Sequence, residues 1–287
     1  MPEIAEVYTM AGGLASLLAV ALDSPLGQLV EPINHPLIKW PGAPLKSVRT
    51  VDGNRVFRDG RGRLPDLLGL CPSGVLHRGK ALALLFGDCP YSLHFHFGMS
   101  GRLGLIESKH TRVSLEFQDG HFLHYIDPRK FGKVSVEHWT TPVTSGGLDV
   151  MQVNEEYLTE LCKSKRRIRS VLTDQGRLAG IGNYLVNEIL WKARINPFQP
   201  ASTLSPAAIA SILKNARETV VESARAGGAT LLDYFGLGGE EGTYAKSFNV
   251  YRKTDCPRCY GPVSRVRNSG EQSSFFCIAC QPINEYL

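Results

Sequence analysis

The sequence predicts an α+β protein: an N-terminal β-sandwich with a flanking N-terminal helix, followed by a helical domain that carries a four-cysteine hairpin. Three observations support this fold class. Apolar residues recur at helical spacing near the N-terminus and again after about residue 150, and they alternate with polar residues in between. Glycine and proline interrupt the alternating region often, which is typical of short strands joined by turns. Two Cys-x-x-Cys pairs stand close to the C-terminus.

The first half of the chain is expected to form one helix and then a series of strands. Residues 3–22 carry apolar side chains at helical spacing. Strands are expected from about residue 27 to residue 138, because residues such as 92–97 alternate polar and apolar side chains. The dipeptide Asp119-Gly120 is typical of a hairpin turn between two of these strands.

The second half is predicted to be helical. Residues 141–147 have the composition of a linker. Helices are predicted at residues 155–163 behind an Asn154 cap, at 166–174, at 182–193, and from Ser205-Pro206 to Ala226, where Gly227-Gly228 stops the helix. These boundaries predict a β-sandwich domain at residues 2–140, a linker at 141–153, a helical domain at 154–248 and a zinc finger at 249–283.

The two cysteine pairs have the spacing of a four-thiolate metal site. They comprise Cys256, Cys259, Cys277 and Cys280. Each pair places two sulfurs on one tight turn, and a hairpin between the turns brings all four sulfurs around one structural zinc ion with no open position. Two disulfides are the alternative, but they need an oxidising compartment, and nothing in the chain indicates one. The remaining cysteines, Cys71, Cys89 and Cys162, are expected to be buried thiols.

The amino-acid composition is that expected of a protein that binds a polyanion. The formal charge is +5, from 32 basic and 27 acidic residues among 287. This balance suits a basic binding face, but it is too small for a histone-like protein. The apolar stretch of residues 14–22 is too short to span a bilayer, and acidic residues precede it, unlike in a signal sequence. We therefore expect an intracellular protein that binds no membrane.

A glycine-rich turn and a basic segment indicate phosphate binding. Residues 180–183, Gly-Ile-Gly-Asn, enter a predicted helix directly, and such a turn directs backbone N–H groups at an anion. Five basic residues precede it within residues 163–169. A solvated helix face would explain that charge run by itself. Together with the turn and the hairpin between the cysteine pairs, which carries Arg265 and Arg267, the run favours a nucleic-acid backbone.

Two further turns display side chains suited to a base stack. Met99 lies at the tip of a glycine-bracketed turn at residues 96–102, although packing beneath the turn would also explain a methionine. A second turn at residues 127–132 displays Arg129 and Phe131. Apolar wedges and an arginine on loops are what a protein uses to enter a base stack and fill the gap left by an extruded nucleotide.

The N-terminus has the elements of a Schiff-base nucleophile. Met1 precedes a small residue and is readily removed, which exposes the secondary amine of Pro2. Glu3 follows with a carboxylate for acid–base chemistry. This pattern is common at the start of proteins and becomes informative only with the motifs above.

Taken together, the motifs resemble the formamidopyrimidine-DNA glycosylase/endonuclease VIII family, in order and over essentially the whole chain. The motifs that carry the resemblance are Pro2-Glu3-x-x-Glu6-Val7, Gly79-Lys80, His96-x-Gly98-Met99-Ser100-Gly101, Asp127-Pro128-Arg129-x-Phe131-Gly132, Gly180-x-Gly182-Asn183 and the two cysteine pairs. The resemblance implies that residues 180–195 belong to a helix–two-turn–helix DNA-binding element and that the hairpin is a zinc finger.

The resemblance also implies a reaction and a role for each residue. The enzyme would excise an oxidised base and then cleave the strand at the abasic sugar by β/δ-elimination. Pro2 would attack the anomeric carbon, Glu3 would act as general acid and base, and Glu6 and Lys80 would complete the catalytic pocket. The DNA contacts would be Lys80, His96, Met99, Arg129, Phe131, Arg169, Gly182, Asn183, Tyr251 and Gln272. Among them, Met99, Arg129 and Phe131 would fill the gap, with Arg129 pairing to the orphaned base and Phe131 wedging the stack.

The chain departs from the family pattern at several positions. Ala5 replaces a proline, Arg169 stands where lysine is common, and Gln272 stands where an arginine usually grips phosphates. The spacing between the cysteine pairs is one residue longer than in typical members.

The expected partner is double-stranded DNA with oxidised bases or abasic sites, bound by a monomer in the cytoplasm and nucleoid or in a nucleus. The favoured lesions are purines such as formamidopyrimidines and 8-oxoguanine. One alternative is an oxidised-pyrimidine glycosylase, which residues 182–190 favour. Another is a non-catalytic damage-binding protein of the same fold, which the neutral Gln272 favours.

Overall fold

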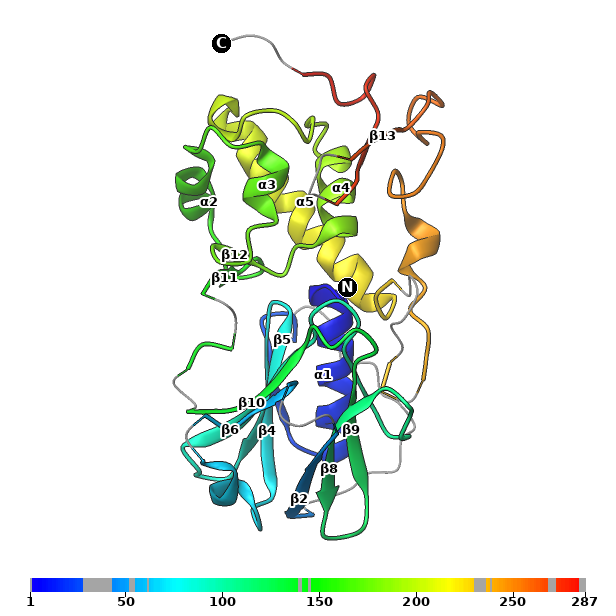
Figure 1. Ribbon diagram of the computed structural model, residues 1–287. Coiled ribbons are helices and arrows are strands. Elements are labelled where there is room, and N and C mark those ends of the chain that lie inside the picture. Colours follow the sequence, from blue (N-terminus) through cyan, green and yellow to red (C-terminus); the bar gives the residue numbers. More distant parts are fainter. Residues whose placement is uncertain are drawn as a thin grey trace. The chain divides into compact units, whose positions relative to one another are not determined.

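A computed structural model describes residues 2–27, 43–51, 55–60, 62–138, 141–143, 146–229, 236–237, 239–267 and 272–283 (Figure 1). Contacts divide the chain into two compact units. The first comprises residues 1–144 and 223–243, and the second comprises residues 145–222 and 244–287. The sequence-based boundaries place residues 223–243 with the helical domain, whereas the contacts group them with the N-terminal unit.

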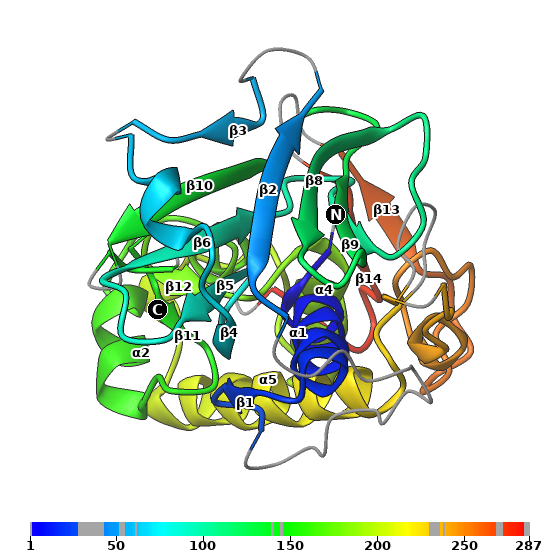
Figure 2. The ribbon, with the colours of Figure 1, turned by 90° about the horizontal axis from the view of Figure 1, so that it is seen from below.

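The first unit contains a six-stranded sheet among its described residues, in the order β1-β4-β5-β6-β10-β3 (Figure 2). The four central strands, β4, β5, β6 and β10, are antiparallel to one another, whereas the edge strands β1 and β3 run parallel to β4 and β10. The strands are β1 (Ala21–Asp23), β3 (Phe57–Arg58), β4 (Pro72–Arg78), β5 (Ala81–Phe86), β6 (Tyr91–His96) and β10 (Lys133–His138), and a short 3₁₀ helix covers Leu64–Leu67.

A four-stranded antiparallel sheet forms the second layer of this unit. Its order is β2-β8-β9-β7, from β2 (Leu45–Thr50), β8 (Thr111–Phe117), β9 (Phe122–Ile126) and β7 (Arg102–Gly104). The turn between β8 and β9 contains Asp119-Gly120, with Gly120 at a φ of 85°, as the dipeptide predicts. Apolar side chains of both sheets pack into one core, in which Leu84, Phe95 and Leu115 are fully buried.

Helix α1 (Ile4–Leu18) contributes to the same core and is buried along nearly its whole length. Its apolar side chains contact β4, β5 and β1. The predicted helix over residues 3–22 is therefore too long: Ala19 adopts a left-handed conformation with a φ of 54°, and the chain continues as β1. No glycine stands at this turn, so the sequence carries no signal for the end of the helix.

Helices dominate the second unit. They are α2 (Glu155–Cys162), α3 (Ile168–Leu172), α4 (Asn183–Lys192) and α5 (Pro206–Arg225), with 3₁₀ helices at Ala201–Thr203 and Tyr244–Ser247. The Asn154 side chain accepts a hydrogen bond from the Tyr157 N–H at 2.9 Å, and the Ser205 hydroxyl accepts one from the Ala208 N–H at 3.2 Å. Both predicted helix starts are therefore confirmed. Strands β11 (Leu148–Asp149) and β12 (Leu178–Ala179) pair in parallel, and β13 (Ser264–Val266) and β14 (Ser274–Phe276) form an antiparallel hairpin.

The predicted fold class is confirmed: two packed sheets with an N-terminal helix, a helical part and a four-cysteine hairpin. Within the described ranges, no helix is long and apolar enough to cross a membrane. Of the three remaining cysteines only Cys162 is buried, so the expectation of three buried thiols is wrong for exposed Cys71 and half-buried Cys89. Met1, parts of the 141–147 and 236–242 segments, the hairpin tip at 268–271 and the last four residues lie outside the described residues.

Candidate active site and nucleic-acid interface

Pro2, Glu3, Glu6 and Lys80 form one buried group in the first unit. Glu3 and Glu6 expose no more than 2% of their surface, and Lys80 exposes 9%. Glu3 is the N-cap of α1, and its backbone N–H donates to the Glu6 carboxylate at 2.8 Å in a capping box. The beginning of α1 therefore holds Pro2 and both carboxylates at fixed positions.

The Glu6 carboxylate also accepts a hydrogen bond from a segment that lies far along the chain but belongs to the same unit. The backbone N–H of Ala229 donates to Glu6 Oε1 at 2.6 Å. Gly228 precedes it at a φ of 82°, and a Cβ there would lie 2.7 Å from Glu6 Oε1. Only glycine therefore fits at residue 228, and the backbone of residues 228–229 closes over the carboxylate.

Lys80 lies close enough to both carboxylates for their charges to act on it. Burial lowers the pKa of Lys80, and the negative charges of Glu3 and Glu6 oppose that effect. The lysine stands in the turn between β4 and β5, directly after Gly79. An ammonium group with a lowered pKa beside two carboxylates suits proton transfer and the binding of an anion.

His96 ends β6 on the same sheet and has an exposed side chain. Desolvation lowers the pKa of His96, and the positive charges of Lys133 and Lys80 lower it further. Its cross-strand neighbours are Ala81 and Lys133. The region around the end of β6 thus combines the side-chain nitrogens of His96, of Lys133 on the neighbouring strand β10 and of Lys80 in the turn before β5, which suits a phosphate group.

The turns that carry Met99 and Arg129 are joined by a buried carboxylate. Asp127 is fully buried, and its carboxylate accepts hydrogen bonds from the Ser100 hydroxyl at 2.6 Å and from the Gly132 N–H at 2.8 Å. Gly98 touches the second turn so closely that a Cβ on it would lie 2.6 Å from the Phe131 carbonyl carbon. The two turns therefore form one rigid unit.

The side chains of Arg129 and Phe131, at the tip of the second of these joined turns, are exposed. Phe131 is 61% exposed, and the Arg129 guanidinium lies over its ring, 5.0 Å from the centroid. Met99, in the first turn, is half-buried. An exposed phenylalanine on a rigid turn, stacked with an arginine, has the form of a wedge for a base stack.

In the second unit, Arg169 connects two helices with the hairpin. Its Nη2 donates to Asn183 Oδ1 at 2.5 Å and to the carbonyl oxygen of Gln272 at 3.1 Å. Asn183 is the first residue of α4 after the Gly182 cap, and its Nδ2 donates to the Tyr251 hydroxyl at 3.4 Å. The structure thus brings together all five residues that the sequence predicts as DNA contacts in this unit.

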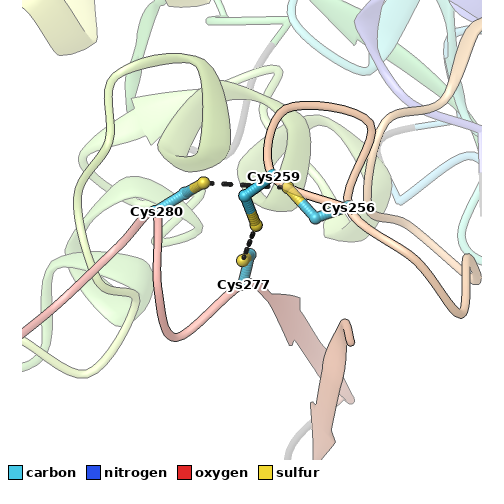
Figure 3. A group of neighbouring side chains, drawn as sticks. All are labelled: Cys256, Cys259, Cys277 and Cys280. Atoms are coloured by element: carbon cyan, nitrogen blue, oxygen red, sulfur yellow. Dashed lines mark hydrogen bonds between the residues drawn. The ribbon is translucent and has the colours of Figure 1, made fainter. Parts of the chain in front are cut away.

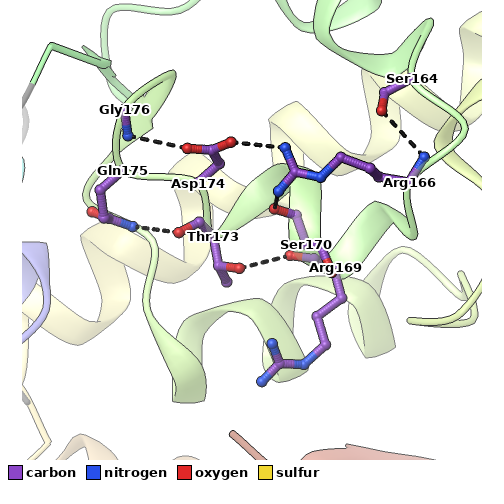
Figure 4. A network of polar contacts seen from close by, with 8 residues as sticks. All are labelled: Ser164, Arg166, Arg169, Ser170, Thr173, Asp174, Gln175 and Gly176. Atoms are coloured by element: carbon purple, nitrogen blue, oxygen red, sulfur yellow. Dashed lines mark hydrogen bonds and ion pairs between the residues drawn. The ribbon is translucent and has the colours of Figure 1, made fainter. Parts of the chain in front are cut away.

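The basic segment before α3 is only partly available to a ligand (Figure 4). Arg166 donates to the Asp174 carboxylate at 2.8 Å and to the Ser170 carbonyl at 3.0 Å, and this arginine lowers the pKa of Asp174. The Arg167 guanidinium lies over the Phe198 ring. These two arginines therefore stabilise the fold locally, so the charge run is not simply a phosphate-binding face.

The four cysteines converge as the spacing predicts (Figure 3). Their sulfur atoms all lie within 4.8 Å of one another, with Cys259 and Cys277 at 3.4 Å and Cys256 and Cys280 at 3.8 Å. Sulfurs of a tetrahedral site with metal–sulfur bonds of about 2.3 Å stand roughly 3.8 Å apart. The separations exceed the length of a disulfide bond, about 2.05 Å. The cluster can therefore bind one metal ion, and the disulfide alternative is wrong.

Helix α4 positions the hairpin through residues that the sequence analysis did not single out. The fully buried Glu188 accepts hydrogen bonds from the N–H groups of Asn249, Val250 and Tyr251 at 2.8 to 3.0 Å. Asn187 Oδ1 accepts from the Phe275 N–H at 2.8 Å. A charged residue among the apolar residues of α4 is the signal that could have indicated Glu188.

The indole of Trp191, also on α4, extends this support to the cysteines. Its N–H donates to the Cys256 sulfur at 3.3 Å. Burial raises the pKa of Cys256, but the hydrogen bonds from Trp191 and from the backbone of Arg258 and Cys259 outweigh burial and lower that pKa to about 6. A thiolate is the form that binds a metal ion.

Family models match both units. The N-terminal domain of formamidopyrimidine-DNA glycosylase matches residues 41–134, and the H2TH domain of formamidopyrimidine-DNA glycosylase matches residues 148–234. Similar proteins include a formamidopyrimidine-DNA glycosylase of Methylobacillus flagellatus, 30% identical over 98% of this chain and 96% of its own. Another, of Halalkalibacterium halodurans, is 31% identical over 98% of this chain and 100% of its own.

Solved structures agree with these relatives. The MutM (Fpg) protein from Thermus thermophilus matches 99% of this chain and 100% of its own with a TM-score of 0.82 at 27% identity. A Lactococcus lactis Fpg mutant in complex with Fapy-dG containing DNA matches 98% of this chain and 100% of its own with a TM-score of 0.81 at 26% identity. The matches span both units, the N-terminal carboxylates and the cysteine hairpin, and the chain belongs to the formamidopyrimidine-DNA glycosylase family.

Proposed function

We propose that this DNA glycosylase and abasic-site lyase excises oxidised purines from double-stranded DNA through a Schiff base on Pro2. The observation that carries the proposal is the buried group of Pro2, Glu3, Glu6 and Lys80 at the start of α1. A pure DNA-binding protein has no use for a buried lysine between two carboxylates, since burying charges costs free energy. Catalysis is therefore favoured over binding alone.

The chemistry begins when removal of Met1 exposes the Pro2 amine. The amine attacks the anomeric carbon of the damaged nucleotide, the bond to the base breaks, and the base departs with a proton. Glu3 protonates the sugar ring oxygen as the ring opens, so that an iminium forms between Pro2 and the sugar. Proton removal next to the iminium then eliminates the phosphates in the β and δ steps, and water releases Pro2.

DNA is held by residues of both units. Lys80 and His96 bind phosphates near the lesion, while Arg169, Asn183, Gly182, Tyr251 and Gln272 form the phosphate-binding group of the second unit. Phe131 wedges the base stack, and Met99 and Arg129 fill the gap, with Arg129 facing the orphaned base. The rigid joining of their two turns supports this role, because a wedge that keeps its shape loses little entropy on binding.

The four cysteines hold one structural zinc ion. The sulfur separations and the indole N–H on Cys256 support this assignment, because zinc prefers four thiolates in a closed tetrahedral site. When bound, zinc fixes the hairpin and takes no part in the reaction. Because its substrate is DNA, the enzyme acts inside the cell. The chain acts as a monomer.

Oxidised purines are favoured as lesions by the names of the relatives and by the DNA in similar structures. One similar structure is MutM in complex with DNA that contains carbocyclic 8-oxo-G, with a TM-score of 0.80 at 26% identity. Met99, Arg129 and Phe131 also match the purine-specific pattern. An oxidised-pyrimidine glycosylase remains the second candidate, because residues 182–190 resemble that branch.

The test is borohydride trapping on duplexes that contain 8-oxoguanine, a formamidopyrimidine, an oxidised pyrimidine or an abasic site. The mature protein should form a covalent complex with abasic-site DNA and cleave the purine lesions faster than the pyrimidine one. An N-terminally blocked protein should trap nothing, whereas Pro2→Gly, which keeps a primary amine, should trap some DNA. Undiminished trapping by the blocked protein would assign the nucleophile to another residue, with Lys80 the next candidate.

A further inference from the structure

The proposed reaction requires Lys80 to be aligned with the first turn of α1. Lys80 itself belongs to a different element, the turn between β4 and β5. Strands β4 and β5 end their pairing at Arg78 and Ala81, so Gly79 and Lys80 alone form the turn between them. Gly79 adopts a left-handed conformation with a φ of 55°. The ladder of the hairpin fixes the backbone on either side of this turn, and a side-chain contact to the turn itself adds to its alignment.

His77 supplies this contact from within β4. Its ring is completely buried, and Nε2 lies 3.1 Å from the carbonyl oxygen of Gly79. Because a carbonyl only accepts hydrogen bonds, Nε2 must carry the proton. Nδ1 then accepts from the Ser24 hydroxyl, 2.8 Å away, and Ser24 Oγ accepts from the Leu26 N–H at 3.2 Å. One tautomer satisfies every member of this chain of hydrogen bonds.

The same imidazole contacts α1. The Tyr8 ring packs edge-on against it with 5.7 Å between ring centroids. Burial lowers the pKa of His77 to about 3, the positive charge of Arg78 acts in the same direction, and the backbone of Ile4 acts to raise this pKa. His77 is therefore neutral at physiological pH, and one ring contacts both the turn that carries Lys80 and the helix that begins beside Glu3.

We propose that His77 is a positioning residue that, together with Ser24, aligns Lys80 with the Pro2–Glu3 end of α1. The inference rests on the proposed function, because this alignment matters only if these groups react with DNA. His77 is too deeply buried to touch the substrate and acts through the Gly79 carbonyl. Its loss should slow the chemical step and change DNA affinity little, because Lys80 is only one of several proposed phosphate contacts.

The chain offers a matched control for this experiment. Ser114 and His124 form a second buried pair, with 2.9 Å between the Ser114 hydroxyl and Nδ1 of the ring. They belong to β8 and β9 of the four-stranded sheet, and neither is part of the proposed catalytic or DNA-binding group. His124→Phe and Ser114→Ala therefore remove the same interaction without reaching the Lys80 turn.

The experiment measures single-turnover base excision and the dissociation constant for lesion DNA. His77→Phe should lower the excision rate roughly 10- to 100-fold, the penalty typical of a misplaced catalytic group. The dissociation constant should change less than about twofold on the same argument. His77→Gln, whose amide nitrogen can reach the Gly79 carbonyl, should recover most of the rate. Ser24→Ala, a mild change that keeps the imidazole, should slow excision several-fold.

A double-mutant cycle separates positioning from general damage to the fold. If His77 acts through Lys80, adding His77→Phe to Lys80→Ala should change the remaining rate less than about twofold. The inference is overturned if the two losses multiply, if His124→Phe slows excision as much as His77→Phe, or if His77→Gln rescues nothing. Should His77→Phe fail to fold, Ser24→Ala combined with Lys80→Ala completes the same cycle.

The outcomes also distinguish this inference from the proposed function. If the wild-type protein excises bases and His77→Phe and Ser24→Ala retain its full rate, only the positioning role is wrong. If the wild-type protein neither excises a lesion nor forms a trapped complex, the proposed function is wrong and the role of His77 falls with it.

Discussion

At the scale of single residues, the neutral side chain of Gln272 reduces the positive charge that the cysteine hairpin can offer to DNA. Its backbone carbonyl accepts from Arg169, while its side chain is exposed and neutral. Arg265 is the charged neighbour on β13, but its guanidinium lies over the Phe275 ring, and its Nε donates to the Ser273 hydroxyl at 3.4 Å. We infer that the hairpin contributes one cation–phosphate contact fewer than an arginine at residue 272 would allow.

Gln272→Arg should therefore tighten binding to damaged and undamaged duplexes alike, because phosphate contacts carry no sequence information. The slope of log affinity against log salt should steepen by about one. The measurement is a salt titration of DNA affinity, with Gln118→Arg, in the exposed turn after β8, as the control for added charge. Equal slopes for wild type and Gln272→Arg, or an equal gain from Gln118→Arg, would contradict a phosphate contact at residue 272.

His77 makes the stability of the protein depend on pH. Its pKa is lowered to about 3 by burial, whereas an unfolded chain restores a value near 6.5. Between these values the unfolded state binds more protons, so the contribution of His77 is complete above pH 6.5 and is lost as pH falls towards 3. The loss is about 1.4 kcal/mol per pH unit.

Denaturant unfolding of wild type and His77→Gln at pH 4, 5, 6 and 7 tests this linkage. The difference in their unfolding free energies should shift in favour of His77→Gln by about 1.4 kcal/mol for each pH unit below 6. A difference that stays constant with pH would mean that folding does not lower the pKa of His77.

At the scale of elements, Asp127 holds the turns at residues 96–102 and 127–132 together as a single piece. Besides the bonds from Ser100 and Gly132, Asp127 Oδ1 lies 3.2 Å from the Arg129 N–H, and the carbonyl of Asp127 accepts from Arg112 Nε at 2.9 Å. The Tyr125 hydroxyl donates to the His96 carbonyl at 2.8 Å, which links the same turns to the end of β6. The wedge residues thus share one buried support.

Asp127→Asn should destabilise the protein by about 2 kcal/mol, because an amide replaces one buried acceptor oxygen with a donor that faces N–H and O–H groups. Asp119→Asn is the matched control, since Asp119 also accepts from a turn N–H but is exposed, and it should change stability by less than about 0.5 kcal/mol. Chemical denaturation measures both. The fluorescence of 2-aminopurine beside the lesion should report slower base extrusion by Asp127→Asn only, and equal effects of the two variants would exclude a specific support.

Sequence patterns identified the elements whose signals are local. Asn154 and Ser205-Pro206 marked helix starts, and Asp119-Gly120 marked a hairpin, because caps and turns depend on neighbouring residues. The same patterns did not predict that Asp127, Glu188 and His77 are buried residues that hold other segments in place. Glu188, for example, binds N–H groups at residues 249–251, far along the chain, and no spacing rule links such segments.

The candidate site was predicted through motif order, and the structure adds how it is held. The four cysteines were found from spacing alone, since ligands on two tight turns leave a fixed interval. The contact of Arg169 with the backbone of Gln272 joins residues more than a hundred positions apart, so the sequence could not indicate it. Within the basic run before α3, Arg166 has its carboxylate partner only eight residues away, so this arginine also stabilises the local fold, while Arg169 of the same run lies among the predicted DNA contacts.

At the scale of the whole molecule, the two units depend on metal to different degrees. All four cysteines belong to the second unit, where α4 and the hairpin share the contacts of Asn187, Trp191 and Arg169. The first unit has its own core between two sheets and α1. Loss of zinc should therefore disturb the second unit and spare the first.

Cys277→Ser should release the metal and weaken DNA binding, while amide protons of α1 and of strands β4 to β6 exchange as slowly as in the wild type. Cys162→Ser, a buried thiol outside the cluster, should keep its metal and its affinity for DNA. Metal analysis and hydrogen exchange followed by mass spectrometry measure these effects. A metal-free preparation that binds DNA with wild-type affinity, or faster exchange in α1, would contradict the assignment.

The hydrogen bond from Ala229 to Glu6 sets an order of events during synthesis of the chain. Its partners are separated by 223 positions. Glu6 leaves the ribosome long before residue 229, so its carboxylate acquires this backbone donor only after residue 229 has followed. A nascent chain with a complete β-sandwich therefore still lacks the backbone donor that closes over Glu6, and the group proposed as catalytic is complete only after residue 229 has emerged.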